Sequence, residues 1–226
     1  MLNLPILDAD CTGLRAVPEI RHDNFILTGD NIFPMFAVDK NQKVYEFSDN
    51  QSPEEIDQTL RQICEETQSS IAILDHSISI NKAYNSLSLG AISKALAIGE
   101  IITSSQKIQD LTNYLQPELI IPAKISNSNL FNKNGFLYGT INAKDNLGNN
   151  YTIYVKNECI YLYKNNKSFY KSPNSICILN QNQKTGIHNG DIKNNQEILI
   201  VCLKATPLWQ SQKAEELFTY PLNEFT

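Results

Sequence analysis

The hydrophobic and polar positions in the first half of the chain alternate over short stretches and then repeat at helical spacing. Residues 36–38 and 44–47 alternate around a polar segment, a pattern that predicts a β-hairpin. A helix is predicted from Ser52, because Ser52 can cap the first turn, Pro53 suits the first helical position and Glu55 completes a capping box. Apolar residues then recur on one helical face, at Ile56, Leu60, Ile63 and Cys64.

Two further helices are predicted before the middle of the chain. Between residues 87 and 102, small and apolar residues recur at helical spacing, as at Ala91, Ala95, Ile98 and Ile102. Gly90 and Gly99 in this stretch indicate close packing, although each glycine weakens the helix. The next helix, residues 107–115, is expected to stop before Pro117.

Strand-like runs lie on both sides of these helices. Residues 70–74 predict a short strand, which residues 77–80 could extend. Beyond Pro122, turn signals at close spacing separate alternating runs, which suggest a small barrel or sandwich. The predicted strands of this half are 136–141, 151–155, 159–163, 175–179 and 197–201. Two Asn-rich tracts, 127–134 and 189–195, are interpreted as polar loops.

These patterns predict an α+β fold in two parts. Residues 1–120 form a mixed α/β portion, and residues 121–226 form a β-rich domain resembling a barrel or sandwich. The boundary is placed at about residues 117–128, where the character of the sequence changes. A chain of 226 residues can bury the cores that such an arrangement needs.

Composition and charge exclude several classes of function. The net charge of −5 and the absence of a basic block argue against a nucleic-acid partner. The apolar runs are far shorter than the ~20 residues that a membrane span needs, and no secretory signal is apparent, so we expect a cytoplasmic protein without a membrane partner. Five scattered cysteines without a CxxC pair argue against structural zinc or a disulfide framework. Cys159, Cys177 and Cys202 are interpreted as small buried hydrophobic residues.

The most distinctive group of charged residues follows the first apolar run. Asp8 and Asp10 are two positions apart, so on a strand their side chains would point the same way, with Arg15 and Glu19 close behind. One carboxylate could hold a water molecule or accept its proton while Arg15 steadies developing negative charge, and the pair could also hold a divalent metal. Alternatively, the aspartates cap backbone N–H groups at a strand-ending turn, and Arg15 and Glu19 pair in a structural network.

Other candidates have weaker signals. Cys11 and His22 could act as a thiolate and its base, although nothing in the sequence fixes their distance. The three histidines lack the spacing of a zinc site. Asn157 interrupts a strand-rich region, where asparagine tolerates a left-handed backbone, so a structural role is favoured there. Trp209 is interpreted as a packing anchor rather than a ligand platform.

The sequence resembles the later portion of the S-methyl thiohydantoin desulfurase family, a hydantoinase-associated family with the signature Asp-Ala-Asp-Gly-Met-Gly-Arg-Ala-Phe-Pro-Glu. The corresponding segment here is Asp8-Ala-Asp10-Cys-Thr-Gly13-Leu-Arg15-Ala-Val-Pro18-Glu19. Further segments resemble family motifs in the same order, at residues 90–99, 135–139, 156–158, 172–176 and 204–209. The chain departs from the family at Cys11-Thr12, at an extra residue between Gly13 and Arg15, and at Asn174, where the family has aspartate.

The resemblance implies a two-domain fold of which this chain lacks most of the first domain. It implies a hydrolase that removes a sulfur substituent from a hydantoin-like cyclic amide ring, with Asp8, Asp10, Arg15 and Glu19 as catalytic residues. Asn157 and Glu158 match the family's Gln-Asn-Glu segment and are expected to bind substrate. The missing half would come from a companion chain, or the protein would form a homo-oligomer. The alternative is a non-catalytic truncated remnant or a protein-binding module.

Overall fold

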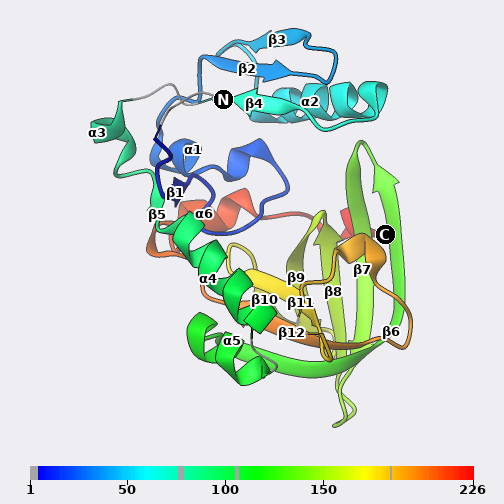
Figure 1. Cartoon of the computed structure of the whole chain (residues 1–226). Coiled ribbons are helices and arrows are strands. Elements are labelled where there is room, and N and C mark those ends of the chain that lie inside the picture. Colours follow the sequence, from blue (N-terminus) through cyan, green and yellow to red (C-terminus); the bar gives the residue numbers. More distant parts are fainter. Residues whose placement is uncertain (1–4, 76–78, 105–106, 184) are drawn as a thin grey trace.

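The computed structural model describes residues 5–75, 79–104, 107–183 and 185–226, and its largest element is a seven-stranded antiparallel sheet in the order β10-β9-β8-β7-β6-β12-β11. Its strands are β6 (Leu119–Lys133), β7 (Phe136–Lys144), β8 (Asn150–Lys156), β9 (Glu158–Lys164), β10 (Lys167–Lys171), β11 (Ser175–Asn180) and β12 (Glu197–Leu203). The sheet curls into half of a barrel (Figure 1), so that β11 comes into contact with β9 although neither strand pairs with the other. Alternating residues fill the inside of the curl, among them Ile141, Ile153, Leu162, Ile198 and Ile200.

The N-terminal half contains a small sheet in the order β3-β2-β4, packed against a long helix (Figure 1). The elements of the N-terminal half are β1 (Ala9–Asp10), η1 (Ile20–His22), α1 (Asn24–Thr28), β2 (Met35–Val38), β3 (Val44–Phe47), α2 (Pro53–Thr67), β4 (Ala72–Leu74), α3 (Ile80–Ala83), β5 (Ser88–Leu89), α4 (Ala91–Ser104) and α5 (Ile108–Leu115). Met35 and Ala37 of β2 pack against Ile56 and Leu60 of α2 in one core. The short strands β1 and β5 pair with each other and lead into α4.

The C-terminal segment returns to the N-terminal half and covers the outer face of the large sheet. It comprises η3 (Pro207–Trp209), α6 (Gln212–Leu217) and η4 (Leu222–Phe225), whereas η2 (Asn189–Asp191) lies before β12. Trp209, Phe218 and Phe225 of this segment share a core with Tyr138 of β7 and Leu27 of α1. Residues from both ends of the chain therefore hold the two halves together, and Trp209 is the packing anchor that the sequence predicts.

Most elements with strong local signals are confirmed. The hairpin β2–β3 forms. A capping box forms at the start of α2, where the Ser52 side chain accepts a hydrogen bond from the Glu55 N–H and the Glu55 side chain accepts one from the Ser52 N–H. Helix α5 ends before Pro117, and β4 occupies part of the strand predicted at 70–74. Residues 76–78 lie outside the described part of the chain, so most of the extension predicted at 77–80 is not described, and at its end Ile80 begins the helix α3 instead. The α+β class with a β-rich second half is confirmed.

Four expectations need correction. The tract 127–134 is not a loop, because residues 127–133 belong to β6 and pair along their length with β7, and these backbone hydrogen bonds outweigh the low strand preference of asparagine. The large sheet contains β6 and β10 in addition to the five strands predicted. Helix α4 starts only at Ala91, since Ser88 and Leu89 form β5. None of the residues of α4 is buried, so the close packing expected around Gly99 does not occur within the described residues, where a Cβ at Gly99 would meet no atom within 4 Å.

Among the described residues, no helix has both the length and the apolar character required to cross a membrane.

Candidate functional site

Asp8 lies at the beginning of α4, where it accepts hydrogen bonds from the helix. Its carboxylate accepts from the backbone N–H groups of Ile92 (2.7 Å) and Ser93 (3.1 Å), and from the Ser93 hydroxyl. These bonds, led by the Ser93 hydroxyl, lower the pKa of Asp8. A helix start exposes backbone N–H groups without partners within the helix, so Asp8 caps α4 in the manner of the structural alternative.

Asp10 is engaged in a different turn. It accepts from the N–H groups of Thr12 (2.8 Å) and Leu14 (2.8 Å), while the Thr12 hydroxyl donates to the Arg15 carbonyl (2.7 Å). Gly13 and Leu14 both have positive φ, so the carboxylate stabilises a backbone turn that few residues adopt. The two aspartates therefore hold separate backbone segments, and the turn held by Asp10 leads directly to Arg15.

A metal site at the aspartates receives no support from their surroundings. Throughout the described residues, no group of three or more His, Cys, Asp or Glu side chains is placed to hold a metal ion. The carboxylate oxygens of Asp8 and Asp10 already accept hydrogen bonds from backbone or hydroxyl donors. These residues do not fit a divalent cation in this arrangement.

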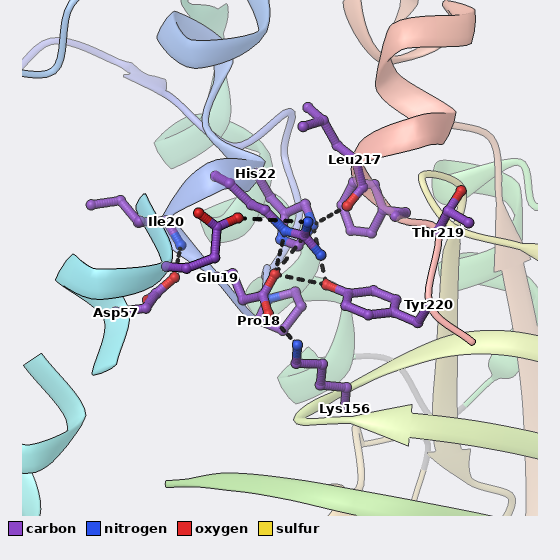
Figure 2. A network of polar contacts seen from close by, with 12 residues as sticks. Pro18, Glu19, Ile20, His22, Asp57, Lys156, Leu217, Thr219 and Tyr220 are labelled. Carbon is purple, nitrogen blue, oxygen red and sulfur yellow. Dashed lines mark hydrogen bonds and ion pairs between the residues drawn. The ribbon is translucent and has the colours of Figure 1, made fainter. Parts of the chain in front are cut away.

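Glu19 lies in a buried polar network between the two halves of the chain (Figure 2). It forms ion pairs with Lys156 at the end of β8 and with Arg21, and it accepts a hydrogen bond from the Tyr220 hydroxyl (2.9 Å). Burial acts to raise the pKa of Glu19, but the hydrogen bond from Lys156 and the two positive charges outweigh it, and the net pKa is lowered. Glu19 therefore joins three parts of the sequence as a charged, well-partnered carboxylate.

His22 and Cys11 do not form a nucleophile with its base. The Nε2 atom of the buried His22 lies 2.9 Å from the Leu217 carbonyl, and its ring stacks on Phe218 at 3.9 Å. Burial lowers the pKa of His22 to about 3 and raises the pKa of Cys11 to about 12. A thiol with so high a pKa is protonated at neutral pH, whereas a nucleophilic cysteine acts as the thiolate.

Arg15 and Glu158, which are far apart in the sequence, line one pocket of ≈270 Å³ where the N-terminal segment meets β9, β11 and the end of β12. The Arg15 guanidinium donates to the Pro173 carbonyl and lies 4.2 Å from the centre of the Phe218 ring. Burial lowers the pKa of Arg15 to about 10, so it stays charged at neutral pH. Burial also raises the pKa of Glu158, although the charges of Arg15 and His188 oppose this shift.

The other walls of this pocket come from residues that are not among the predicted site residues. The lining includes Ser175, Ile176 and Cys177 of β11, together with Leu203 of β12. A second depression shares Glu158 and Cys177 and extends the pocket toward His188. Burial raises the pKa of Cys177, which keeps it a neutral thiol. The family-like segment at residues 172–176 includes Ser175 and Ile176 but does not by itself indicate a pocket, because the curl of the sheet brings β11 beside β9.

Asn157, the other residue expected to bind substrate, forms the tight connection between β8 and β9. Its φ is 54°, as the left-handed interpretation anticipates, and its side-chain oxygen accepts from the Leu137 N–H (2.8 Å). The side chain of Asn189 donates to the Asn157 carbonyl (2.7 Å). Asn157 thus fixes the position of the neighbouring Glu158, and the structural role favoured by the sequence is observed.

Asp57 of α2 borders the polar network from the other side (Figure 2). Its carboxylate accepts from the Ile20 N–H (2.8 Å). Burial raises the pKa of Asp57 to about 6, against the effects of the Ile20 hydrogen bond and the charge of Arg61, and Glu19 adds to the rise. The folded chain therefore binds the Asp57 proton more tightly than the unfolded chain, whose pKa there is 3.8.

Asp57→Asn is expected to stabilise the protein at pH 8 but not at pH 4. The stability that the protonated carboxyl contributes is fully present below 3.8 and is lost as the pH rises through about 6. Asparagine keeps an oxygen for the Ile20 N–H without a charge, so the expected gain at pH 8 is about 1–3 kcal/mol. Urea denaturation at both pH values measures it, with exposed Asp49→Asn as the control. His22 titrates alike in both proteins, so an equal gain at both pH values would contradict the assignment to Asp57.

Comparison with known proteins identifies the domain. Residues 51–220 match the family model described as S-Me-THD-like, C-terminal domain. A crystal structure of a protein from Chromobacterium violaceum matches with a TM-score of 0.70 and 19% identity, over 96% of this chain and 63% of that chain. At this identity the likeness concerns the fold, and the chain spans less than two thirds of that protein. No curated protein matches. Since the family match covers well over half of its residues, the chain belongs to the family that carries the S-Me-THD-like C-terminal domain.

Proposed function

We propose that this chain takes part in a hydrolase reaction on a small, hydantoin-like cyclic amide ring, which binds between Arg15 and Glu158. The observation that carries the proposal is the pocket itself, where a charged guanidinium and a carboxyl of raised pKa line the same small cavity. Membership of the S-Me-THD-like family supports the class of substrate. We place this activity in the cytoplasm, in keeping with five cysteines that are all free thiols.

The chemistry of the pocket suits such a ring. A hydantoin-type ring is flat and presents carbonyl acceptors beside N–H donors, so Arg15 can donate to a carbonyl while Glu158 accepts from an N–H. Leu14, Ile176 and Leu203 supply apolar walls for the ring faces. Pockets for small molecules hold roughly 300–1,000 Å³, and a cavity of ≈270 Å³ lies just below that range, which favours a single ring with short substituents.

The proposed reaction is a hydrolytic exchange of sulfur for oxygen. Water adds across the C=N bond at the ring carbon that bears the sulfur substituent. The C–S bond then breaks, the carbon becomes a carbonyl, the sulfur leaves as a thiol, and the second proton of the water ends on the ring nitrogen. Glu158 takes a proton from the water and returns it to the departing sulfur, a task for which a raised pKa is suited. Arg15 stabilises the negative charge that develops on the ring.

The remaining predicted catalytic residues receive positioning roles in this proposal. Asp10 holds the turn that leads to Arg15, and Asp8 holds the start of α4. Glu19 anchors Lys156, which is followed directly by Asn157 and Glu158. Direct participation of Asp8, Asp10 or Glu19 in the reaction stays a prediction, and turnover by their amide variants would test it.

Binding to the pocket can be measured with S-methyl thiohydantoin in isothermal titration calorimetry. Arg15→Gln and Glu158→Gln are each expected to weaken binding by about 10- to 100-fold, because each removes a hydrogen bond that involves a charged group. Glu46→Gln on the exposed part of β3 is the matched control and should bind as the unmodified chain does. Circular dichroism confirms folding of each variant. Unchanged affinity in both folded pocket variants would overturn the proposal.

The alternative is a binding module without catalysis, which is favoured by the neutral Cys177 thiol and by the hydrogen bonds that Asp8 and Asp10 already accept from the backbone and from Ser93. Chromatographic detection of the desulfurised ring separates the two proposals. Ring binding that depends on Arg15 and Glu158 without any product would support the binding module. Product formation lost in Glu158→Gln would support the hydrolase.

A further inference from the structure

Glu158 lies where two cavities meet. Four residues line both the pocket that contains Arg15 and the depression of ≈280 Å³ that reaches His188, namely Glu158, Cys159, Ile176 and Cys177. Burial raises the pKa of Glu158, and the charges of both Arg15 and His188 oppose that rise, so both groups lie close to this carboxyl. Arg15 lines only the first cavity and His188 only the second, so the carboxyl of Glu158 is common to both.

The depression beyond Glu158 is mostly apolar. Its lining includes Ile178 and Leu179 of β11, and Ile187 from the segment that follows this strand. The amide side chains of Asn157 and Asn189 also line it, but each already forms a hydrogen bond with another part of the chain. Most of the space is therefore suited to an apolar group.

His188 brings a hydrogen-bond donor to the rim of this depression. It is an exposed residue, and its Nδ1 atom accepts a hydrogen bond from the Gly190 N–H (3.2 Å). A neutral imidazole carries one proton on its two nitrogen atoms, so an accepting Nδ1 leaves that proton on Nε2. In the part of the chain that the structure describes, Nε2 has no hydrogen-bond partner. The Nε2–H group is therefore available to a ligand.

We propose that the second depression binds a chain carried by the ring, and that His188 donates from Nε2 to a carbonyl oxygen at the end of that chain. This inference rests on the proposed binding of the ring between Arg15 and Glu158. The first cavity, of ≈270 Å³, suits a ring with short substituents only, so a longer chain has to leave it. The second depression offers mostly apolar space directly beside it, along the walls that the two share.

The chemistry of the depression defines the end of the chain. A single N–H donor at its rim suits one carbonyl acceptor. A neutral amide suits the site better than a carboxylate, because the acidic Glu158 lines the same depression. The proposed ligand class is therefore a hydantoin-like ring with an apolar chain of a few atoms that ends in an amide.

Isothermal titration calorimetry with three S-methyl thiohydantoins tests the proposal on the full chain. The tetrahedral ring carbon carries only hydrogen in the first compound, a 3-methylbutyl chain in the second and a 2-carbamoylethyl chain in the third. We expect the 3-methylbutyl compound to bind about tenfold more tightly than the unsubstituted ring, or better, because each buried methylene adds about fourfold in affinity. If the unsubstituted ring binds and the chain adds nothing, this inference is overturned while the proposed function stands. If none of the three compounds binds, the proposed function fails as well.

Two substitutions at His188 separate the Nε2 donor from the Nδ1 acceptor. In His188→Asn, the side-chain oxygen can accept from the Gly190 N–H as Nδ1 does, but asparagine places no donor at the position of Nε2. In His188→Gln, the longer side chain can place its amide N–H near that position, so this variant is the matched control.

The second and third compounds have nearly the same shape, but only the carbamoylethyl chain ends in a carbonyl. We expect His188→Asn to weaken binding of the carbamoylethyl compound relative to the 3-methylbutyl compound by about 3- to 10-fold, and His188→Gln to recover most of this loss. The ratio of the two dissociation constants, measured on one protein, cancels any general effect of a substitution on the pocket. The same ratio in all three proteins would overturn the role of His188, whatever the affinity for the unsubstituted ring.

Discussion

Lys156→Met is expected to lower the free energy of unfolding by about 3–5 kcal/mol, because it leaves the buried Glu19 carboxylate without its principal partner. Only 7% of the Lys156 side chain and 9% of the Glu19 side chain are exposed to solvent. The ammonium group also lies 4.4 Å from the centre of the Tyr220 ring. Since Arg21 and Tyr220 remain beside Glu19, the expected loss lies at the lower end of the range.

Urea denaturation measures this loss, and a second ion pair provides the control. Lys171 pairs with Glu215 on the surface, where both side chains are about half exposed, so Lys171→Met should change stability by only about 0–1 kcal/mol. The double variant Glu19→Gln/Lys156→Met removes both charges and should recover part of the loss. If Lys156→Met and Lys171→Met destabilised the protein equally, the buried pair would not have the role assigned to it.

Trp209→Ala is expected to destabilise the protein by about 3–5 kcal/mol, because it empties the core between the two ends of the chain. Trp209 is fully buried, and its indole N–H donates to the Asn24 side chain (2.6 Å). The backbone of Gly13 lies so close to the indole that a Cβ there would be 2.5 Å from Cδ1. Loss of the ring therefore removes packing, a hydrogen bond and a support for the turn that precedes Arg15.

Far-UV circular dichroism during urea denaturation measures this loss of stability. Tryptophan fluorescence cannot follow unfolding of the variant, because Trp209 is the sole tryptophan of the chain. Phe169→Ala on β10 is the control, because that ring is substantially exposed and its loss should change stability by less than about 1 kcal/mol. We also expect Trp209→Ala to weaken ring binding, since the Arg15 turn rests on the indole. A stability loss no greater than that of Phe169→Ala would show that the two ends are held together by other contacts.

Local chemistry explains which elements the sequence predicts correctly. The capping box at Ser52 and Glu55 satisfies backbone groups within one helical turn, so it forms wherever that segment lies. The hairpin β2–β3 and the left-handed Asn157 likewise depend on neighbouring residues. The asparagine-rich part of β6, residues 127–133, depends instead on pairing with β7, and its composition alone suggests a loop.

The residues of the candidate site are likewise recognisable from the sequence, whereas their partners depend on the tertiary structure. The sequence shows a polar group that consists of Asp8, Asp10, Arg15 and Glu19. In the structure, each of these four side chains binds a different part of the chain. Arg15 meets Glu158 at the pocket, and Glu19 meets Lys156 in the buried network. Strand alternation fixes which way a side chain points from its own backbone, but it does not specify which distant segment receives it.

The sequence by itself determined the α+β class, the family, the capped helix α2 and the packing role of Trp209, since these follow from periodicity, capping residues and motif order. Tertiary structure alone decided the pocket and the buried network around Glu19. The curl of the large sheet places β11 beside β9, which creates the walls around Glu158. Contacts of this kind join residues far apart in the chain, and they arise from the packing of whole elements rather than from any local pattern.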